Sequence, residues 1–216
     1  RAEAVSIQAK ETCRKMQLGR MTDWCSLIHQ VVLNLQGKSK LPWVLKGDAY
    51  DEHEKLAMAV TQNDMADIFR IYFYKGWLHF LFGRYKEAVE YFRETESYSL
   101  YGSGHYMLPL FYLYDSQASA GILDLEPQVD RQKILGRIAH NIEKIEVWAR
   151  FAPMNYQHKK DLMEAEKARL EGRDAEAEEA RRNAQRESTA ARAEAELQDY
   201  RRALRSCLEG RGYAVQ

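Results

Sequence analysis

The residues of this sequence that most resemble a reactive site form the acidic run Asp51-Glu52-His53-Glu54. Carboxylates and imidazoles are the side chains that bind metal ions and transfer protons. On a helix, however, residues one and two positions apart point in different directions, so these four side chains cannot converge on one ion. Acidic residues in a first helical turn also complement the helix dipole. The run therefore predicts the start of a helix, and we expect no bound metal or cofactor.

The histidines and cysteines give no stronger signal for chemistry. None of the six histidines has a histidine four residues away, the spacing of a helical metal site. An asparagine follows His140, where a phosphoacceptor histidine would have an acidic neighbour. Cys13, Cys25 and Cys207 form no Cys-x-x-Cys pair, and their odd number disfavours a disulfide framework and favours the reducing cytoplasm. We expect Cys25, beside Trp24, to be a buried and unreactive thiol.

Nucleotide-binding and kinase motifs are absent from the sequence. There is no Gly-x-x-x-x-Gly-Lys-Ser/Thr loop, and Gly102-Ser103-Gly104 is typical of a turn. The Gly-rich loop and the His-Arg-Asp and Asp-Phe-Gly strings of protein kinases are also missing. An enzyme needs convergent polar groups in a cleft, and the sequence offers no such constellation. We therefore expect a protein that is not an enzyme.

The overall composition narrows the classes of partner. The 216 residues carry 32 basic and 32 acidic side chains, so the chain has no general attraction for nucleic acid or anionic lipid. The sequence contains no run of about 18 apolar residues, so it predicts no membrane-spanning helix. Because the sequence begins at Arg1 and shows no signal-peptide pattern, we expect a piece of a larger protein.

Glycine and proline, the residues that interrupt helices, are few in this sequence, and most of them occur in clusters. Asn-Gly and Asp-Gly turns and β-branched runs of period two are missing, which predicts an all-α chain. The last third, rich in Ala, Glu and Arg, has no Gly or Pro between Arg173 and Glu209 and favours one helix of about 35 residues. The other expected helices span residues 2–36 (one or two helices, with a bend near Gly19), 51–63, 64–82, 85–98, 106–125, 127–150 and 156–171.

The string from Phe80 to Phe92 resembles the turn and second helix of a tetratricopeptide repeat. Gly83 allows a tight turn, and the small Ala88 lets two helices approach closely, with Phe92 filling the groove behind it. The other matching positions are Gly76, where the first helix needs a small residue, and Tyr85 at the corner.

A second turn of the same kind lies at Gly172, which is followed five residues later by Ala177. We therefore predict stacked antiparallel helical hairpins over residues 1–172. Residues 173–216 are interpreted as an Ala/Arg/Glu-rich helical extension that is either a diverged or a truncated repeat. Aromatic residues at helical spacing are expected to form mainly core. A concave surface lined by Tyr74, His79 and Tyr106 is the predicted partner groove, because stacked hairpins present such a surface.

Several strings also resemble, in the same order, a helical region of very large multi-domain signalling proteins of bacteria and fungi. Those proteins are serine/threonine or hybrid histidine kinases that carry an AAA/STAND-type ATPase module. The resemblance covers roughly residues 20–175 and fades after Gly172. Its strings are Val31–Gly37, the acidic run at Asp51, Leu81-Phe82-Gly83, residues 111–116, residues 141–156 and the stretch from Glu164 to Arg173.

This resemblance implies a scaffold for interaction or signal relay between the nucleotide-binding module and the sensor and kinase domains, without catalytic residues of its own. The expected partner is a protein or a neighbouring domain of the same polypeptide. An alternative is a small-molecule-sensing helical domain with an aromatic pocket.

Overall fold

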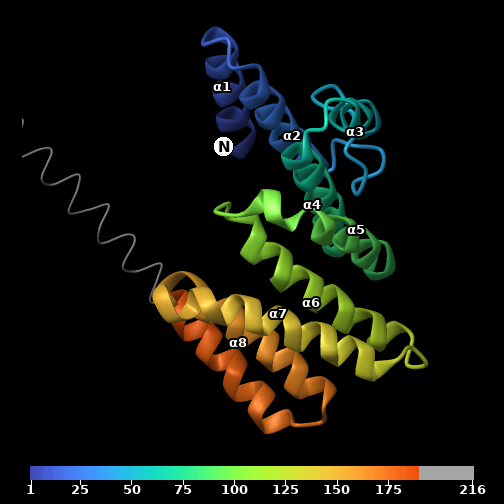
Figure 1. Cartoon of the computed structure of the whole chain (residues 1–216), viewed down its shortest axis with the longest axis vertical. Coiled ribbons are helices and arrows are strands. Elements are labelled where there is room, and N and C mark those ends of the chain that lie inside the picture. Colours follow the sequence, from blue (N-terminus) through green and yellow to red (C-terminus); the bar gives the residue numbers. More distant parts are fainter. Residues whose placement is uncertain (190–216) are drawn as a thin grey trace, which may run out of the picture. The chain divides into compact units, whose positions relative to one another are not determined.

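The computed structural model describes residues 1–189, and within this range the regular structure is helical (Figure 1). The all-α prediction is confirmed. None of the helices in this part of the chain has the length and apolarity needed to cross a bilayer. The helices are α1 (Ala2–Lys15), α2 (Gly19–Leu35), α3 (Glu52–Thr61), α4 (Met65–Leu81), α5 (Tyr85–Ser97), the 3-10 helix η1 (Ser99–Gly102), α6 (Met107–Leu125), α7 (Arg131–Phe151) and α8 (Pro153–Leu170).

Two proline positions correct the expected helix bounds. Pro127 does not start α7, which begins at Arg131; Glu126, the residue before it, has left the helical region at the end of α6, as a residue before proline prefers. Pro153 separates α7 from α8 as expected, but α8 begins at the proline itself and not at residue 156, because a missing N–H costs nothing at the first helical position. Residues 174–189 are helical, and the rest of the long helix expected up to Glu209 lies outside the described residues.

One backbone motif recurs at the ends of five helices. At Gly83, which has φ 72°, the Gly83 N–H donates to Phe80 O (3.0 Å) and the next N–H donates to His79 O (2.9 Å). This is the Schellman motif, which satisfies the last carbonyls of a helix and needs a left-handed residue. The same pair of bonds and a positive φ occur at Gln17, Gly37, Asn63, Gly83 and Gly172.

Close steric fit joins α4, α5 and α6. A Cβ atom on Gly76 of α4 would lie 2.7 Å from the ring of Phe92 of α5, so only glycine allows this approach. Ala88 and Phe92 are fully buried, and the Phe92 ring lies 5.9 Å from that of Phe111 on α6. Tyr85 fills the space above Gly121 of α6 in the same way. The residues that suggested a repeat therefore form the contacts between these helices.

The chain divides into two compact units at Arg131, whereas the sequence suggested a boundary at residue 172. The second unit begins at Gln132, and residues 174–189 run back along α8 within it. Glu166 of α8 accepts a bond from Arg181 at 3.4 Å, and Ala177 is buried. Gly172 thus closes a hairpin inside the second unit instead of marking its edge.

Candidate functional site

Aromatic side chains from α2, α4, α6 and the segment before α6 contact one another in a continuous row. Ring centroids lie 5.1 Å apart for Trp24 and His105, 4.7 Å for His105 and Tyr106, and 6.0 Å for Tyr74 and Trp77. The hydroxyl oxygens of Tyr74 and Tyr106 are 2.8 Å apart, and Trp77 lies 6.0 Å from Tyr114. We call Trp24, His105, Tyr106, Tyr74, Trp77 and Tyr114 the aromatic row.

The aromatic row combines a buried base with an open edge. Tyr74 is 4 % exposed, and its burial raises the pKa of its hydroxyl, as does the bond with Tyr106. Tyr106 is 54 % exposed. Among the described residues, the buried indole N–H groups of Trp24 and Trp77 have no hydrogen-bond partner. Because these two nitrogens are enclosed, the part of the row that a partner can reach is its open edge at Tyr106.

His79, the third residue of the predicted groove, lies apart from Tyr74 and Tyr106. Its Nδ1 is 2.8 Å from Lys75 O, its ring lies 4.8 Å from that of Tyr91 on α5, and it is 5 % exposed. The cause is helical geometry, because a separation of five residues turns a side chain by about 140° from Tyr74. Burial lowers the pKa of the His79 imidazole. The groove as predicted is therefore not formed, and only its two tyrosines meet.

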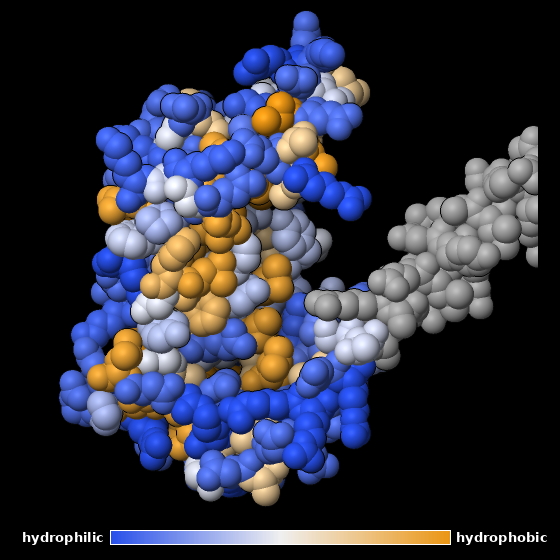
Figure 2. All heavy atoms as spheres, turned by 180° about the vertical axis from the view of Figure 1, so that it is seen from behind, coloured by the Kyte–Doolittle hydropathy of each residue, from blue (hydrophilic) through white to orange (hydrophobic). Residues whose placement is uncertain are grey.

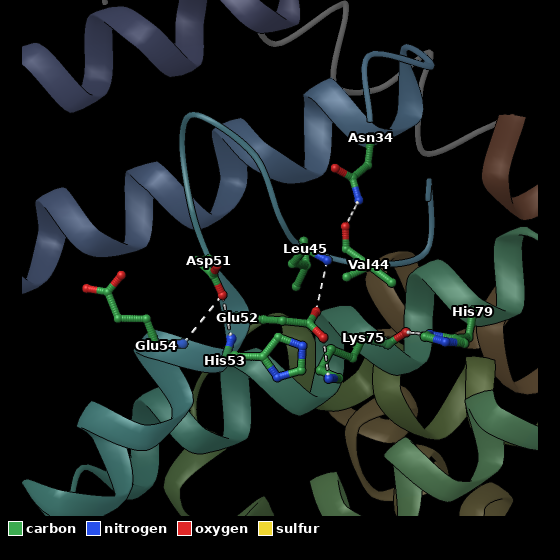
Figure 3. Close-up of polar contacts among 9 residues, drawn as sticks. All are labelled: Asn34, Val44, Leu45, Asp51, Glu52, His53, Glu54, Lys75 and His79. Atoms are coloured by element: carbon green, nitrogen blue, oxygen red, sulfur yellow. Dashed lines mark hydrogen bonds and ion pairs between the residues drawn. The ribbon is translucent and has the colours of Figure 1, made fainter. Parts of the chain in front are cut away.

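A buried ion pair anchors the segment between α2 and α3 (Figure 3). Lys75 Nζ lies 2.6 Å from Glu52 Oε1, and the other Glu52 oxygen accepts a hydrogen bond from the Leu45 N–H at 2.8 Å. Asn34 Nδ2 donates to the carbonyl oxygens of Val44 (2.7 Å) and Pro42. Both charged side chains are less than a tenth exposed. These bonds hold the segment against α2 and α4.

The acidic run at Asp51 is used for structure. Asp51 caps α3, accepting bonds from the N–H groups of His53 and Glu54, while Glu52 points inward to Lys75 (Figure 3). The bond from Lys46 lowers the pKa of the Asp51 carboxyl. In residues 1–189 no three His, Cys, Asp or Glu side chains are grouped so that they could hold a metal ion.

A small charged cleft lies between α2, α3 and α4. Its volume is about 80 Å³, and three carboxylates and three cations line it. Burial and the nearby Asp64 raise the pKa of the Asp67 carboxyl. The acids and bases pair with one another: Asp64 with Arg20 at 2.6 Å, Asp23 with Lys55 at 2.8 Å, and Asp67 with Arg70. Ion pairs thus account for the six charged side chains that line the cleft.

Two larger hollows were not foreseen from the sequence. One, of about 510 Å³, lies beside residues 38–48 and is lined by Lys38, Lys40 and Lys46 together with apolar side chains. Glu3 and Asp51 already pair with two of these lysines. The other, of about 520 Å³, lies in the second unit between α7, α8 and residues 174–189. Both hollows carry mixed charges, and the aromatic row lines neither.

Apolar side chains also reach the surface of the first unit. Leu35 and Leu41 are exposed, and Phe82, at the end of α4, packs against Trp43 with ring centroids 6.5 Å apart. Figure 2 shows that several apolar side chains on the drawn face of the first unit lie next to one another instead of being scattered singly. Contiguous apolar surface of this kind is typical of sites that contact other molecules.

The structure also brings together two cysteines that sequence reasoning treated as unrelated. The Sγ atoms of Cys13 on α1 and Cys25 on α2 are 3.9 Å apart, and both residues are partly exposed. Cys25 is therefore not fully buried, contrary to expectation. The signal that could have revealed the pair is the bend expected near Gly19, since a hairpin that turns at Gln17 brings Cys13 and Cys25 together.

Comparisons with known proteins give no match: no protein-family model, no curated protein and no solved structure is similar to this chain. The functional argument therefore depends on the geometry described above.

Proposed function

We propose that this chain is a non-catalytic scaffold of tetratricopeptide-like helical hairpins that binds a protein partner through the aromatic row. The partner is a separate protein or a neighbouring domain of the same polypeptide. The observation that carries the proposal is the row itself, which combines a buried base with an open edge at Tyr106. Interfaces are enriched in tyrosine and tryptophan for this reason: one end is apolar and the other can hydrogen-bond.

The packing of α4, α5 and α6 supports the repeat-like part of the proposal. Helix α6 packs against both α5 and α4, as the first helix of a following repeat does in a stack of hairpins. The fit of Phe92 against Gly76 makes this part a rigid support. A rigid support lowers the entropic cost of binding, because the aromatic side chains are already ordered.

The wider context stays a prediction from the sequence resemblance. It places the scaffold in the cytoplasm, within a large signalling protein that carries ATPase and kinase domains elsewhere. The alternative, a small-molecule sensor with an aromatic pocket, has less support from the geometry. The side chains of the aromatic row pack against each other, and neither of the two larger hollows is lined by them.

Two exposed tyrosines of the same segment give a matched test. Tyr106 belongs to the aromatic row and is 54 % exposed, whereas Tyr101 of η1 is 55 % exposed and does not belong to it. The unaltered chain, Tyr106→Ala and Tyr101→Ala are used as baits in quantitative affinity capture. We expect at least one protein whose recovery falls about tenfold with Tyr106→Ala only, since central aromatic residues dominate interfaces.

Thermal unfolding of both variants checks that the change is local, because Tyr106→Ala also removes the bond to Tyr74. Tyr106→Phe, which keeps the ring, should retain most of the capture. Equal capture profiles for the alanine variants would contradict the proposal. A small molecule that raises the melting temperature of the unaltered chain but not of Tyr106→Ala would favour the sensor instead.

A further inference from the structure

The α1–α2 hairpin places two thiols in van der Waals contact. Cys13 lies in the last turn and a half of α1 and Cys25 in the second turn of α2, with the Sγ atoms 3.9 Å apart. The helices are joined by a short turn in which Gln17 has φ 58°. The two cysteines are therefore held facing each other by the fold, although twelve positions separate them in the sequence.

Little else ties down the N-terminal helix. Helix α1 packs against α2, and an exposed ion pair of 2.7 Å joins Glu3 to Lys38 beyond the end of α2. Only Ser6 of α1 is classed as buried. An amphipathic contact of this size leaves a terminal helix among the less stable parts of a protein. A covalent bond across the hairpin would therefore have a large effect on α1.

We propose that Cys13 and Cys25 are a thiol–disulfide modification site, oxidised to an intramolecular disulfide by a small-molecule disulfide of the glutathione type. One cysteine thiolate attacks a sulfur of the oxidant and releases one thiol, leaving a mixed disulfide. The second cysteine thiolate attacks the protein sulfur of that mixed disulfide and releases the second thiol. Two protein thiols are thus oxidised, the oxidant is reduced to two thiols, and the protons from the cysteines end on the released thiols.

The site fits a reversible modification better than a catalytic role. Burial raises the pKa of the Cys25 thiol, and the neighbouring Cys13 adds to this effect. The raised pKa lowers the thiolate fraction of Cys25 and slows its exchange, so the proposal stands on the contact of the two Sγ atoms, which favours ring closure once a mixed disulfide has formed. The oxidised state would fasten α1 to α2, and the reduced state would leave α1 free to open.

The test uses the full chain with Cys207→Ser, so that only the two cysteines of the hairpin can react. It is equilibrated with a series of ratios of oxidised to reduced glutathione, quenched with acid and alkylated. We expect a product lighter by two hydrogen atoms, in which the tryptic peptides 11–14 and 21–38 are linked. Hydrogen exchange of amides in residues 9–16 should then slow by about tenfold or more, because closing the loop restricts the open state.

Matched controls are Cys13→Ser and Cys25→Ser in the same background, each of which should give only a glutathione adduct and unchanged exchange in α1. The proposal is overturned if the two-cysteine chain accumulates glutathione adducts or disulfide-linked dimers without the internal link. It is equally overturned if the link forms but exchange in α1 does not slow.

Discussion

Two helical hairpins have the same turn but different interior side chains. One is formed by α4 and α5, and the other by α8 and residues 174–189. Gly83 and Gly172 have φ values of 72° and 76° and make the same pair of Schellman bonds. Ala88 and Ala177 follow five residues later in both hairpins, and both are buried. Behind Ala88 stands the large ring of Phe92, which fits against Gly76. The second hairpin instead combines buried alanines with the buried Met163 and Leu170, and an ion pair between Glu166 and Arg181 lies across it.

This difference shows that a turn specifies a hairpin locally, whereas the interior decides how firmly it is held. Where an aromatic ring packs directly against a glycine, there is no room for a side chain on that glycine. Surface ion pairs are adaptable and individually weak. We therefore expect the first unit to be the rigid support of the aromatic row and the second unit to respond little to changes in its surface ion pairs. Four predictions test this contrast.

The largest difference is expected for the ion pairs. Lys75→Met leaves Glu52 charged and buried, which should cost about 3–5 kcal/mol of unfolding free energy. In the second unit, Lys160 pairs with Glu164 at 3.4 Å near the surface, so Lys160→Met should cost less than about 1 kcal/mol. Urea denaturation measures both. Adding Glu52→Gln to Lys75→Met should recover much of the loss; equal losses for the two single variants would erase the contrast.

A glycine in each unit gives the next test. Gly76→Ala drives a Cβ atom into the Phe92 ring and should destabilise the chain by about 2–3 kcal/mol. Gly136 lies within α7 with nothing within 4 Å of its added Cβ. Gly136→Ala should therefore stabilise by about 0.5–1 kcal/mol through helix propensity. The measurement is the urea midpoint of each variant, and a neutral Gly76→Ala would show that α4 and α5 do not fit closely.

Replacing the turn glycine should cost the same stability in the two hairpins. Gly83→Ala and Gly172→Ala both place a side chain in the left-handed region, at a cost of about 1–2 kcal/mol each. Neither glycine has a neighbour within 4 Å of an added Cβ, so backbone strain is the whole effect. Chemical denaturation of the two variants should give costs within experimental error of each other. A cost at one turn only would refute the shared motif.

The smallest expected effect is a loss of thermal stability at acidic pH that arises from His79. Burial lowers the folded-state pKa of His79 below its ordinary 6.5. Below that pH the imidazole therefore binds a proton more readily in the unfolded chain than in the folded protein, which favours unfolding. Its contribution to stability is therefore complete above pH 6.5 and is lost as the pH falls below that value. We expect Tm to fall by a few degrees between about pH 7.5 and 5.5, and to fall less in His79→Leu. An identical fall in the variant would contradict this assignment.

The sequence was informative where a single residue type determines local geometry. Gly37, Gly83 and Gly172 predicted helix ends, and each adopts the left-handed turn. The bend expected near Gly19 lies at Gln17 instead, where a residue other than glycine has a positive φ of 58° between α1 and α2.

Side-chain partners were harder to predict than elements. Glu52 belonged to a run that suggested a helix start, but its pairing with Lys75 depends on how α3 packs against α4. The aromatic residues of α4 were expected as core, and the meeting of Tyr74 with Tyr106 was included in the groove prediction. His79 was placed in that groove although its position on the helix turns it toward α5. The contact of Cys13 with Cys25 required the hairpin geometry itself.

The most direct test of the proposed binding surface is hydrogen exchange on the complex with a partner captured in a Tyr106-dependent way. The account predicts slower exchange in the part of α4 around Tyr74 and Trp77 and in the segment that leads into α6. Residues 174–189 should be unaffected. Protection confined to the second unit, with the α4 and α6 segments exchanging as in the free chain, would contradict it.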